Sequence, residues 1–490
     1  MSVRPAESAD DDRYPPARQF DVVATSSFHQ GICRLSCFNR MNRRSETAFR
    51  NLIRCLLVLL ISSAAFVQTS SADTLRVLDD NTAALQARFQ LIDSAKRRID
   101  FACFELRADD VSHAVLAHLW MAARRGVEVR LIVDAYGNQI SSSVLAELVG
   151  DGVQIRRFHP FRLRNAHRYT RRMHDKLLIA DQRLMIVGGR NLGSVYFGRS
   201  REANFVDRDF AITGSTVDHA AYYFEQLWAS DAIVPFCPRC ESSNFGQTTY
   251  DSPVGIPLTT PAELLYRGLC NVDADVSRKR IFIRPGPVFD IPSARLRFLH
   301  SNRVVTGVLP DITDEILTLI DSSCREILIE TPYLILSRRI ERALRAAAQR
   351  GVCVHLLGNS LASIDKPFAH AGYVNQKETI LRMGIDLWEY RGPDMLHAKT
   401  ILVDDCVVIG SYDLHPRSEH YDTETAVLVS DARITAAIRA SMMQHFAGAM
   451  QVGRSPVYRE TRGLTGSPRK ARILKMQVFR LPALLLKKHL

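Results

Sequence analysis

The chain has 490 residues, of which 46% are hydrophobic and 24% charged, and it carries a formal net charge of +12. This length exceeds one ordinary domain, and the composition excludes a largely disordered chain. Ten cysteines spread along the chain exclude a dense disulfide framework. The positive charge favours anionic partners, namely phospholipid head groups, a membrane surface or nucleic acid, without separating them.

The N-terminal extension, residues 1–72, contains an apolar run at 55–67 that follows four arginines and precedes small residues ending at Ala72. This order is typical of an export signal, because the run is shorter than the ~20 apolar residues of a membrane-spanning helix. An uncleaved anchor and a buried helix are the alternatives. Residues 1–40 are polar, and Met41 is an alternative start. We expect an exported protein, periplasmic or secreted, or one associated with the cell membrane.

A first α/β domain is expected over residues 73–235. Residues 98–104 form a candidate strand, and residues 111–125 carry apolar side chains at helical spacing. Residues 127–134 form the next candidate strand. Gly126 lies between the helix and this strand, where glycine is the usual residue that ends a helix.

A second domain, residues 296–455, repeats this order. A candidate strand at 326–330 is followed by a helix at 338–349, then Gly351 and a strand at 352–357. The recurrence indicates an internal duplication. Strands joined by crossover helices imply a parallel or mixed sheet. The predicted fold class is therefore α/β, with two similar halves that each contain a mixed β-sheet flanked by helices.

Residues 236–295, between the halves, are rich in Pro, Ser, Thr and Asn and are predicted to be a linker or insertion. They contain the C-x-x-C pair Cys237 and Cys240. An incidental or disulfide-forming pair is favoured over a redox role or half a zinc site, because no second pair follows at zinc-finger spacing. We predict no metal site and no cofactor.

The tail, residues 456–490, is basic and amphipathic. Its part from Thr461 to Leu490 carries eight Lys or Arg and no Asp or Glu, mixed with apolar residues. Such a segment suits the surface of an anionic membrane. The alternative is a solvated tail with a short helix or strand docked on the core, since Pro482 interrupts any long helix.

A pattern H-x-K-x-x-x-x-D occurs twice, 223 positions apart, with the residues His174, Lys176, Asp181 and His397, Lys399, Asp404. Residues two apart on a strand point to the same face, so the His and Lys of each copy are expected to project together. Glycine-containing tails follow, Gly188-Gly-Arg-Asn191 and Gly410-Ser-Tyr-Asp413. If the fold brings the copies face to face, the pocket suits a phosphodiester, with a nucleophile, an acid and two cations.

The two motifs and their tails resemble the phospholipase D superfamily, and the match covers roughly residues 80–450. The stretches 171–198 and 358–373 look like the C-type bacterial cardiolipin synthases. The resemblance implies an active site between two phospholipase D-type halves. It also implies a phosphodiesterase or phosphatidyltransferase of cardiolipin synthase type that acts on phospholipids through a phosphohistidine. Both half-sites lie in one chain, which favours a monomer.

A phosphodiester site neutralises the phosphoryl oxygens, supplies a nucleophile and protonates the leaving alcohol. The residues expected to bind phosphate are Lys176, Lys399, Asn191 and Ser411. The resemblance implies His174 as the nucleophile and His397 as the acid and base.

Each histidine also needs a carboxylate on its other ring nitrogen. The candidates are Asp207, 33 residues after His174, and Glu424, 27 residues after His397, each on the strand after its motif. Asp181 and Asp404 are expected to hold loops and strands around the site rather than to touch substrate.

A basic run precedes the first motif and comprises Arg156, Arg157, Arg162, Arg164, Arg168, Arg171 and Arg172. We expect it to grip lipid phosphates or a membrane surface; a solvated basic loop is the alternative.

The second motif departs from the pattern in two ways. Five residues separate Asp404 from Gly410, where six separate Asp181 from Gly188, and Asp413 stands where the family usually has Asn. A carboxylate there adds negative charge beside the phosphate. Three alternatives to a cardiolipin synthase-type transferase remain: a secreted phospholipase D that releases phosphatidic acid, a nuclease of the same superfamily, and a catalytically inactive membrane-binding protein. The expected partners are phospholipid substrates and an anionic membrane surface rather than nucleic acid.

Overall fold

The computed structural model describes residues 72–160, 170–238, 260–279, 286–305, 311–453 and 470–486. The expected export signal and the central part of the basic run, 161–169, lie outside these residues. In the described part of the chain, no helix combines the length and apolar character needed to cross a bilayer.

Nine strands form the first sheet, in the order β10-β1-β8-β6-β5-β2-β3-β4-β9. Their bounds are Ala72–Leu78 (β1), Arg98–Cys103 (β2), Glu128–Asp134 (β3), Gln154–Phe158 (β4), Lys176–Ala180 (β5), Leu184–Gly188 (β6), Asp209–Thr213 (β8), Ile233–Pro235 (β9) and Val288–Pro292 (β10). Strands β2, β3 and β4 pair in parallel, whereas β5, β6, β8 and β1 continue the sheet with antiparallel pairs. The sheet is therefore mixed, as predicted.

The second sheet repeats this topology in the order β11-β18-β17-β16-β12-β13-β14-β19. Its strands are Leu296–His300 (β11), Glu326–Glu330 (β12), Cys353–Asn359 (β13), Asp386–Tyr390 (β14), Thr400–Val403 (β16), Cys406–Gly410 (β17), Thr425–Val429 (β18) and Ala449–Gln451 (β19). Position by position, these strands correspond to the first sheet without β10, with β11 in the place of β1. The predicted duplication is confirmed.

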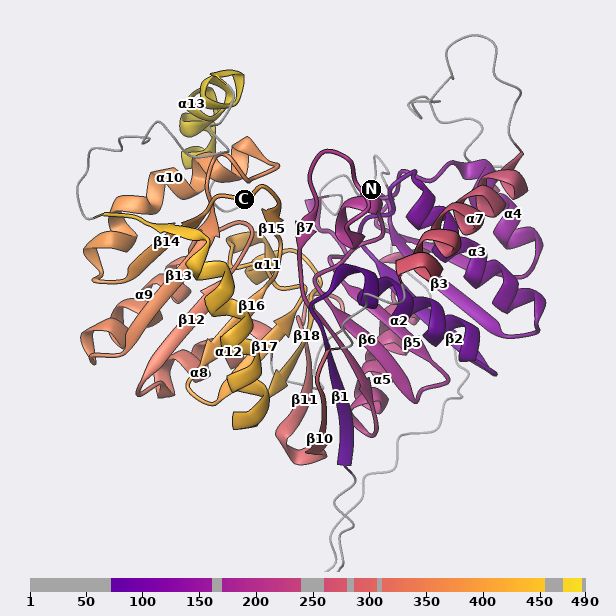
Figure 1. The fold of residues 1–490 in the computed structure, drawn as a ribbon, viewed down its shortest axis with the longest axis horizontal. Helices are drawn as coiled ribbons and strands as arrows, with labels where there is room; N and C mark the ends of the chain where they lie inside the picture. Colours follow the sequence, from indigo (N-terminus) through magenta and orange to yellow (C-terminus); the bar gives the residue numbers. More distant parts are fainter. Residues whose placement is uncertain are drawn as a thin grey trace, which may run out of the picture. The chain divides into compact units, whose positions relative to one another are not determined.

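Helices flank the strands of each half (Figure 1). The first half and the segment after it contain Asn81–Ser94 (α2), Asp110–Arg124 (α3), Ser142–Gly150 (α4), Thr216–Ala229 (α5) and Pro261–Lys279 (α7). The second half and tail contain Ile312–Ser322 (α8), Arg338–Gln349 (α9), Pro367–Arg382 (α10), Pro416–His420 (α11), Ala432–Ala447 (α12) and Lys470–Leu485 (α13). Gly126 and Gly351 follow the ends of α3 and α9 with φ of 87° and 88°, the left-handed geometry that ends helices.

One hydrophobic core is shared by both halves and positions the site between them. It joins inward-facing strand residues such as Phe210 of β8 and Val427 of β18. Helices α5 and α12 contribute Phe224 and Met442 to the same core. Because all of these side chains are buried, the two halves exclude water along a common face.

The segment 236–295, expected as a linker or insertion, contains α7 and β10. Helix α7 packs along α3, and β10 pairs antiparallel with β1, so its described residues extend the first half. Cys237 is disulfide-bonded, while Cys240 lies outside the described residues. In the tail, α13 continues through Pro482 and ends three residues after it.

Candidate active site

The motif histidines lie just before the first residues of strands rather than within them. His174 precedes β5 by two residues, and His397 precedes β16 by three. Each lysine folds back on its own motif, since Nζ of Lys176 donates to the backbone carbonyl of His174 at 2.7 Å and Nζ of Lys399 to that of His397 at 2.8 Å. The expectation that strand geometry makes the His and Lys of each copy point the same way therefore does not apply, because the histidines lie outside the strands. A local hydrogen bond from the lysine to the histidine carbonyl holds the two residues together instead.

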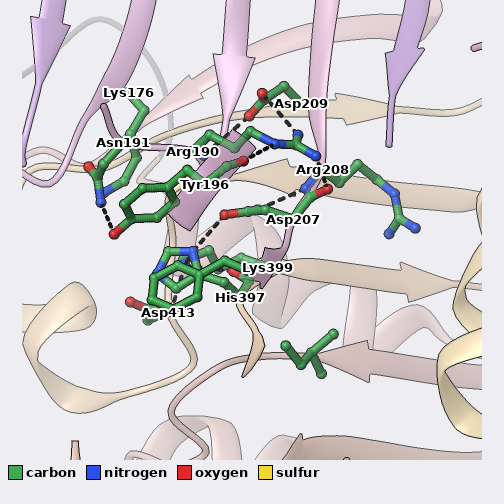
Figure 2. A network of polar contacts seen from close by, with 12 residues as sticks. Lys176, Arg190, Asn191, Tyr196, Asp207, Arg208, Asp209, His397, Lys399 and Asp413 are labelled. Carbon is green, nitrogen blue, oxygen red and sulfur yellow. Dashed lines mark hydrogen bonds and ion pairs between the residues drawn. The ribbon is translucent and has the colours of Figure 1, made fainter. Parts of the chain in front are cut away.

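Each histidine is paired with a carboxylate from the other half of the chain. Nδ1 of His174 lies 3.1 Å from both carboxylate oxygens of Glu424. Nδ1 of His397 lies 2.5 Å from Oδ2 of Asp207 (Figure 2). The two acids are those that the sequence predicted, but the expected pairing of each acid with the histidine of its own copy is wrong.

The exchange follows from backbone pairing between the halves. The two-residue strands Phe205–Val206 (β7) and Met395–Leu396 (β15) pair in parallel, and Met173 forms a parallel bridge with Thr423. In each case, the next residue is a histidine on one side and an acid on the other. The acids thus lie directly before or near the start of β8 and β18, beside the partner half's histidine.

Both carboxylates are held by further contacts. The hydroxyls of Ser411 and Ser418 donate to the two oxygens of Glu424, that of Ser418 at 2.5 Å. The backbone N–H of Arg208 donates to Asp207 at 2.8 Å. Ser411 therefore orients an acid in this structure, and its expected contact with phosphate stays a prediction.

The amide of Asn191 is likewise engaged with the protein. Its Nδ2 donates to the hydroxyl of Tyr196 at 2.9 Å, and its Oδ1 accepts from the backbone N–H of Glu105 at 3.2 Å. Tyr196 in turn donates to the Glu105 carboxylate at 2.7 Å. Figure 2 shows the hydrogen bond between Asn191 and Tyr196 above His397. Phosphate binding by Asn191 requires that it exchange one of these bonds.

Asp413 occupies the position in the second half that Asn191 holds in the first. Its carboxylate is 1% exposed and lies 3.9 Å from Nε2 of His174, 3.6 Å from Nζ of Lys399 and 3.6 Å from Nε2 of His415. A lysine and two histidines thus surround the extra negative charge. His415 was missed by the sequence reasoning, whose only signal was its place two residues after Asp413.

Burial dominates the electrostatics of the site. Desolvation, reinforced by the neighbouring lysine charges, holds the pKa of His174 and that of His397 well below the ordinary value. Burial also lowers the pKa of Lys176 to about 8. Burial raises the pKa of Asp207 and Glu424. A neutral His174 with Nδ1 facing Glu424 presents the lone pair of Nε2, which is the state a nucleophile requires.

Aromatic rings and one arginine complete the site, and sequence reasoning assigned them no role. Phe104 meets the ring of His174 edge-on at 5.0 Å, and Phe205 stacks on His397 at 5.1 Å. Arg190 is buried and donates to the backbone carbonyls of Leu78 and Asp207. Packing of this kind limits rotation of the imidazoles.

Asp181 and Asp404 sit at the strand ends opposite the histidines. Asp181 accepts the backbone N–H groups of three consecutive residues, Lys96 to Arg98. Asp404 accepts those of Cys324 to Glu326. Each acid ties the motif strand to the start of its neighbour, β2 or β12.

Two arginines of the basic run, Arg156 and Arg172, donate hydrogen bonds to other parts of the fold. Arg156 donates to the carbonyl of Trp228 at 2.8 Å and lies over its ring. Arg172, 6% exposed, donates to Asp134 at 3.1 Å. The expectation that the run grips lipid phosphates is wrong for Arg172, because its guanidinium group is buried; Arg156 is partly exposed, and for it the expectation stays a prediction. Arg171 is exposed.

Comparison with known proteins agrees with this geometry. Residues 89–228 and 316–446, each containing one motif, match the family described as "Cardiolipin synthase, PLD-like domain". Cardiolipin synthase C of Escherichia coli K12 is 26% identical over 411 residues, covering 75% of this chain and 83% of that protein. An uncharacterized protein of Helicobacter pylori J99 is 25% identical over 407 residues, with 75% and 78% covered. The crystal structure of phosphatidylserine synthase from Haemophilus influenzae Rd KW20 shares the fold, with a TM-score of 0.60, 16% identity, and 85% and 95% of the two chains covered.

Proposed function

The chain belongs to the phospholipase D-like cardiolipin synthase family, and on this premise we propose that it is a phosphatidyltransferase acting on phospholipids. It moves a phosphatidyl group from one phospholipid to an alcohol group of a second, as a cardiolipin synthase does. His174 is the nucleophile, and His397 is the general acid and base. The observation that supports this most is the exchanged pairing of the two histidines with Glu424 and Asp207.

In the first step, Nε2 of His174 attacks the donor phosphorus. The bond from phosphorus to the head-group oxygen breaks, and His397 gives its proton to that oxygen. Lys176 and Lys399 neutralise the phosphoryl oxygens. A bound phosphodiester carries negative charge and therefore raises the pKa of His397, which opposes the effect of burial and supplies the protonated acid.

In the second step, His397 takes the proton of the incoming alcohol, whose oxygen attacks phosphorus. The bond to Nε2 of His174 breaks and the free enzyme is restored. Water as the acceptor gives phosphatidic acid through the same residues. One chain supplies both half-sites, so a monomer suffices. The side chain of His174 is 13% exposed against 5% for His397, which favours His174 as the group that meets phosphorus.

A lipid-product assay tests the function. Purified full-length protein is incubated with mixed micelles of phosphatidylglycerol and phosphatidylethanolamine, and we expect cardiolipin. His174→Ala should lower the rate by about 10³-fold or more, as loss of a nucleophile does in other covalent enzymes. His219→Ala, an exposed histidine on α5, is the matched control and should keep the wild-type rate. Phosphatidic acid without cardiolipin would instead indicate hydrolysis, and no lipid product would redirect the search to DNA and RNA.

A trapping experiment tests the order of the histidines. A donor with a good leaving group, such as a nitrophenyl ester, needs little acid catalysis. With such a donor carrying a radioactive phosphate, His397→Ala should accumulate acid-labile label on the protein, whereas His174→Ala should remain unlabelled. Label on His174→Ala would reverse the two roles.

A further inference from the structure

Helix α13 is docked on the second half by one apolar face. Ala483 is 1% exposed and packs with Ala371 of α10, and Phe479 meets Phe368 edge-on at 5.6 Å. The backbone carbonyl of Arg480 accepts from Asn375 of α10 at 2.8 Å, and its guanidinium donates to the same side chain at 3.2 Å. These contacts fix the rotation of α13 about its axis.

A second apolar face of α13 points away from the protein. Its residues follow the 4-3-4 spacing that places side chains in one line along a helix: Leu474, Val478, Leu481 and Leu485, which are 63%, 63%, 66% and 76% exposed. We call these four residues the outer stripe. Of the eleven exposed large hydrophobic side chains among the described residues, six belong to α13 or to the residue after it. This concentration marks an interaction surface rather than scattered exposure.

The charge beside the outer stripe indicates an anionic partner. Residues 461–490 carry eight Lys or Arg and no acid. On the described part of α13, Lys475 and Arg480 are exposed next to the stripe. A helix with an apolar face and basic flanks is the kind that lies in the interface of an anionic bilayer, with its cations at the head-group level.

Helix α10, on which α13 packs, begins beside the active site. Lys366, directly before α10, lies 5.2 Å from the ring centre of Tyr333, and Tyr333 donates to Asp365 at 2.8 Å. The Tyr333 ring lies 6.4 Å from that of His415, the neighbour of Asp413. Since Phe368 of α10 contacts Phe479 of α13, a short series of contacts joins the stripe's helix to the site.

We propose that the outer stripe of α13 inserts into the interfacial region of an anionic phospholipid bilayer and holds the active site against lipid head groups. The inference rests on the proposed function for its lipid substrate, because a phosphatidyl donor resides in such a bilayer. Membrane docking by α13 can be measured by fluorescence quenching, which does not depend on catalysis.

Depth-dependent fluorescence quenching tests the docking directly. Full-length Leu481→Trp is mixed with vesicles of phosphatidylglycerol and phosphatidylethanolamine whose acyl chains carry bromine. Relative to unbrominated vesicles, the added Trp fluorescence should fall by about half or more, as expected of a side chain at the acyl boundary. Met443→Trp on α12, where Met443 is 42% exposed, is the control and should keep its fluorescence. If the indole introduced by Leu481→Trp stays unquenched on vesicle-bound protein, the proposal is overturned, even if another segment binds the membrane.

A substrate comparison separates the docking from the chemistry. The double variant Leu474→Glu with Leu481→Glu should lose about tenfold or more of its rate on vesicles, because charges on the stripe oppose insertion. Its rate on short-chain phosphatidylglycerol below the micellar concentration should stay within twofold of wild type. Equal losses on both substrates would contradict the docking.

A wild-type protein that turns over neither substrate would refute the proposed function, but it would not affect the result of the quenching experiment. If sedimentation shows a dimer that the double variant disrupts, and Leu481→Trp shows no quenching, a second copy is the occupant and the bilayer proposal fails.

Discussion

At the scale of single residues, burial rather than residue type sets the chemistry of the site. A lysine in water is protonated to well above neutral pH, whereas desolvation brings the pKa of Lys176 to about 8. Asp413 is equally buried, and His174, Lys399 and His415 face it within 4 Å. The charge that a phosphodiester meets is therefore a balance among these groups.

The lowered pKa of Lys176 predicts an alkaline limit for activity. Protonated Lys176 attracts phosphate, so its deprotonation should lower kcat/KM as the pH rises through about 8, by about tenfold per unit well above that value. Arginine stays charged throughout this range. Lys176→Arg should lower kcat/KM but shift the limit upward by at least one pH unit. A pH profile of both proteins measures this, and a variant that keeps its limit at pH 8 assigns the limit to another group.

At the scale of elements, each motif hairpin contacts neighbouring segments at both of its ends. The hairpins β5–β6 and β16–β17 are anchored at one end by Asp181 and Asp404 through backbone N–H groups. At the other end, the tails differ between the halves. Ser411 reaches its acid with a hydroxyl, whereas at Gly189 an added Cβ would lie 2.1 Å from Oδ1 of Asp207. Glycine is required there because the carboxylate occupies the space of a side chain.

We therefore predict that Gly189→Ala displaces Asp207 and deprives His397 of its partner. The kcat should fall by about 100-fold or more, by analogy with loss of the acid from a catalytic triad. The overpacked site should also lower the free energy of unfolding by about 1–3 kcal/mol. Gly150→Ala is the matched control, because a Cβ at Gly150 meets nothing within 4 Å. Kinetics and denaturant unfolding measure both effects, and an active, stable Gly189→Ala would contradict the role of Asp207.

At the scale of the whole molecule, buried polar contacts join the halves behind the site. Arg208 of the first half donates to Asp79 at 2.6 Å and, across the interface, to Glu330 at 3.3 Å, Thr400 at 2.8 Å and Ser441 at 2.7 Å. The side chain of Asp79 is 38% exposed, and the Arg208 charge lowers its pKa. Removal of this arginine leaves the buried Glu330 carboxylate without its guanidinium partner.

Arg208→Met should thus lower the free energy of unfolding by about 3–5 kcal/mol, the range found when one partner of a buried ion pair is removed. Arg433→Met is the control. The Arg433 side chain is 61% exposed, and its partner Asp431 keeps the backbone N–H of residue 433 and Arg295, so this change should lower stability far less than Arg208→Met does. Urea unfolding followed by circular dichroism compares the two. If both variants have the same free energy of unfolding, the contacts of Arg208 contribute no net stability.

The sequence by itself determined much of the local structure and singled out the candidate reacting groups. The helix predicted at about 338–349 coincides with α9, and the run 98–104 predicted β2 to within one residue. The repeated motif named the histidines, lysines and acids, because residue type and spacing are local properties. Local patterns encode backbone conformation and burial, and these elements depend on little else.

Only the tertiary structure decided which groups meet. The acids that orient His174 and His397 lie 250 and 190 residues away, in the opposite half, and pairing of β7 with β15 brings one of them into place. The same long-range packing turned Ser411 and Asn191 toward protein partners and left the outer stripe of α13 exposed. The physical reason is that contacts between distant segments depend on how two similar halves pack, and no spacing along the chain records that arrangement.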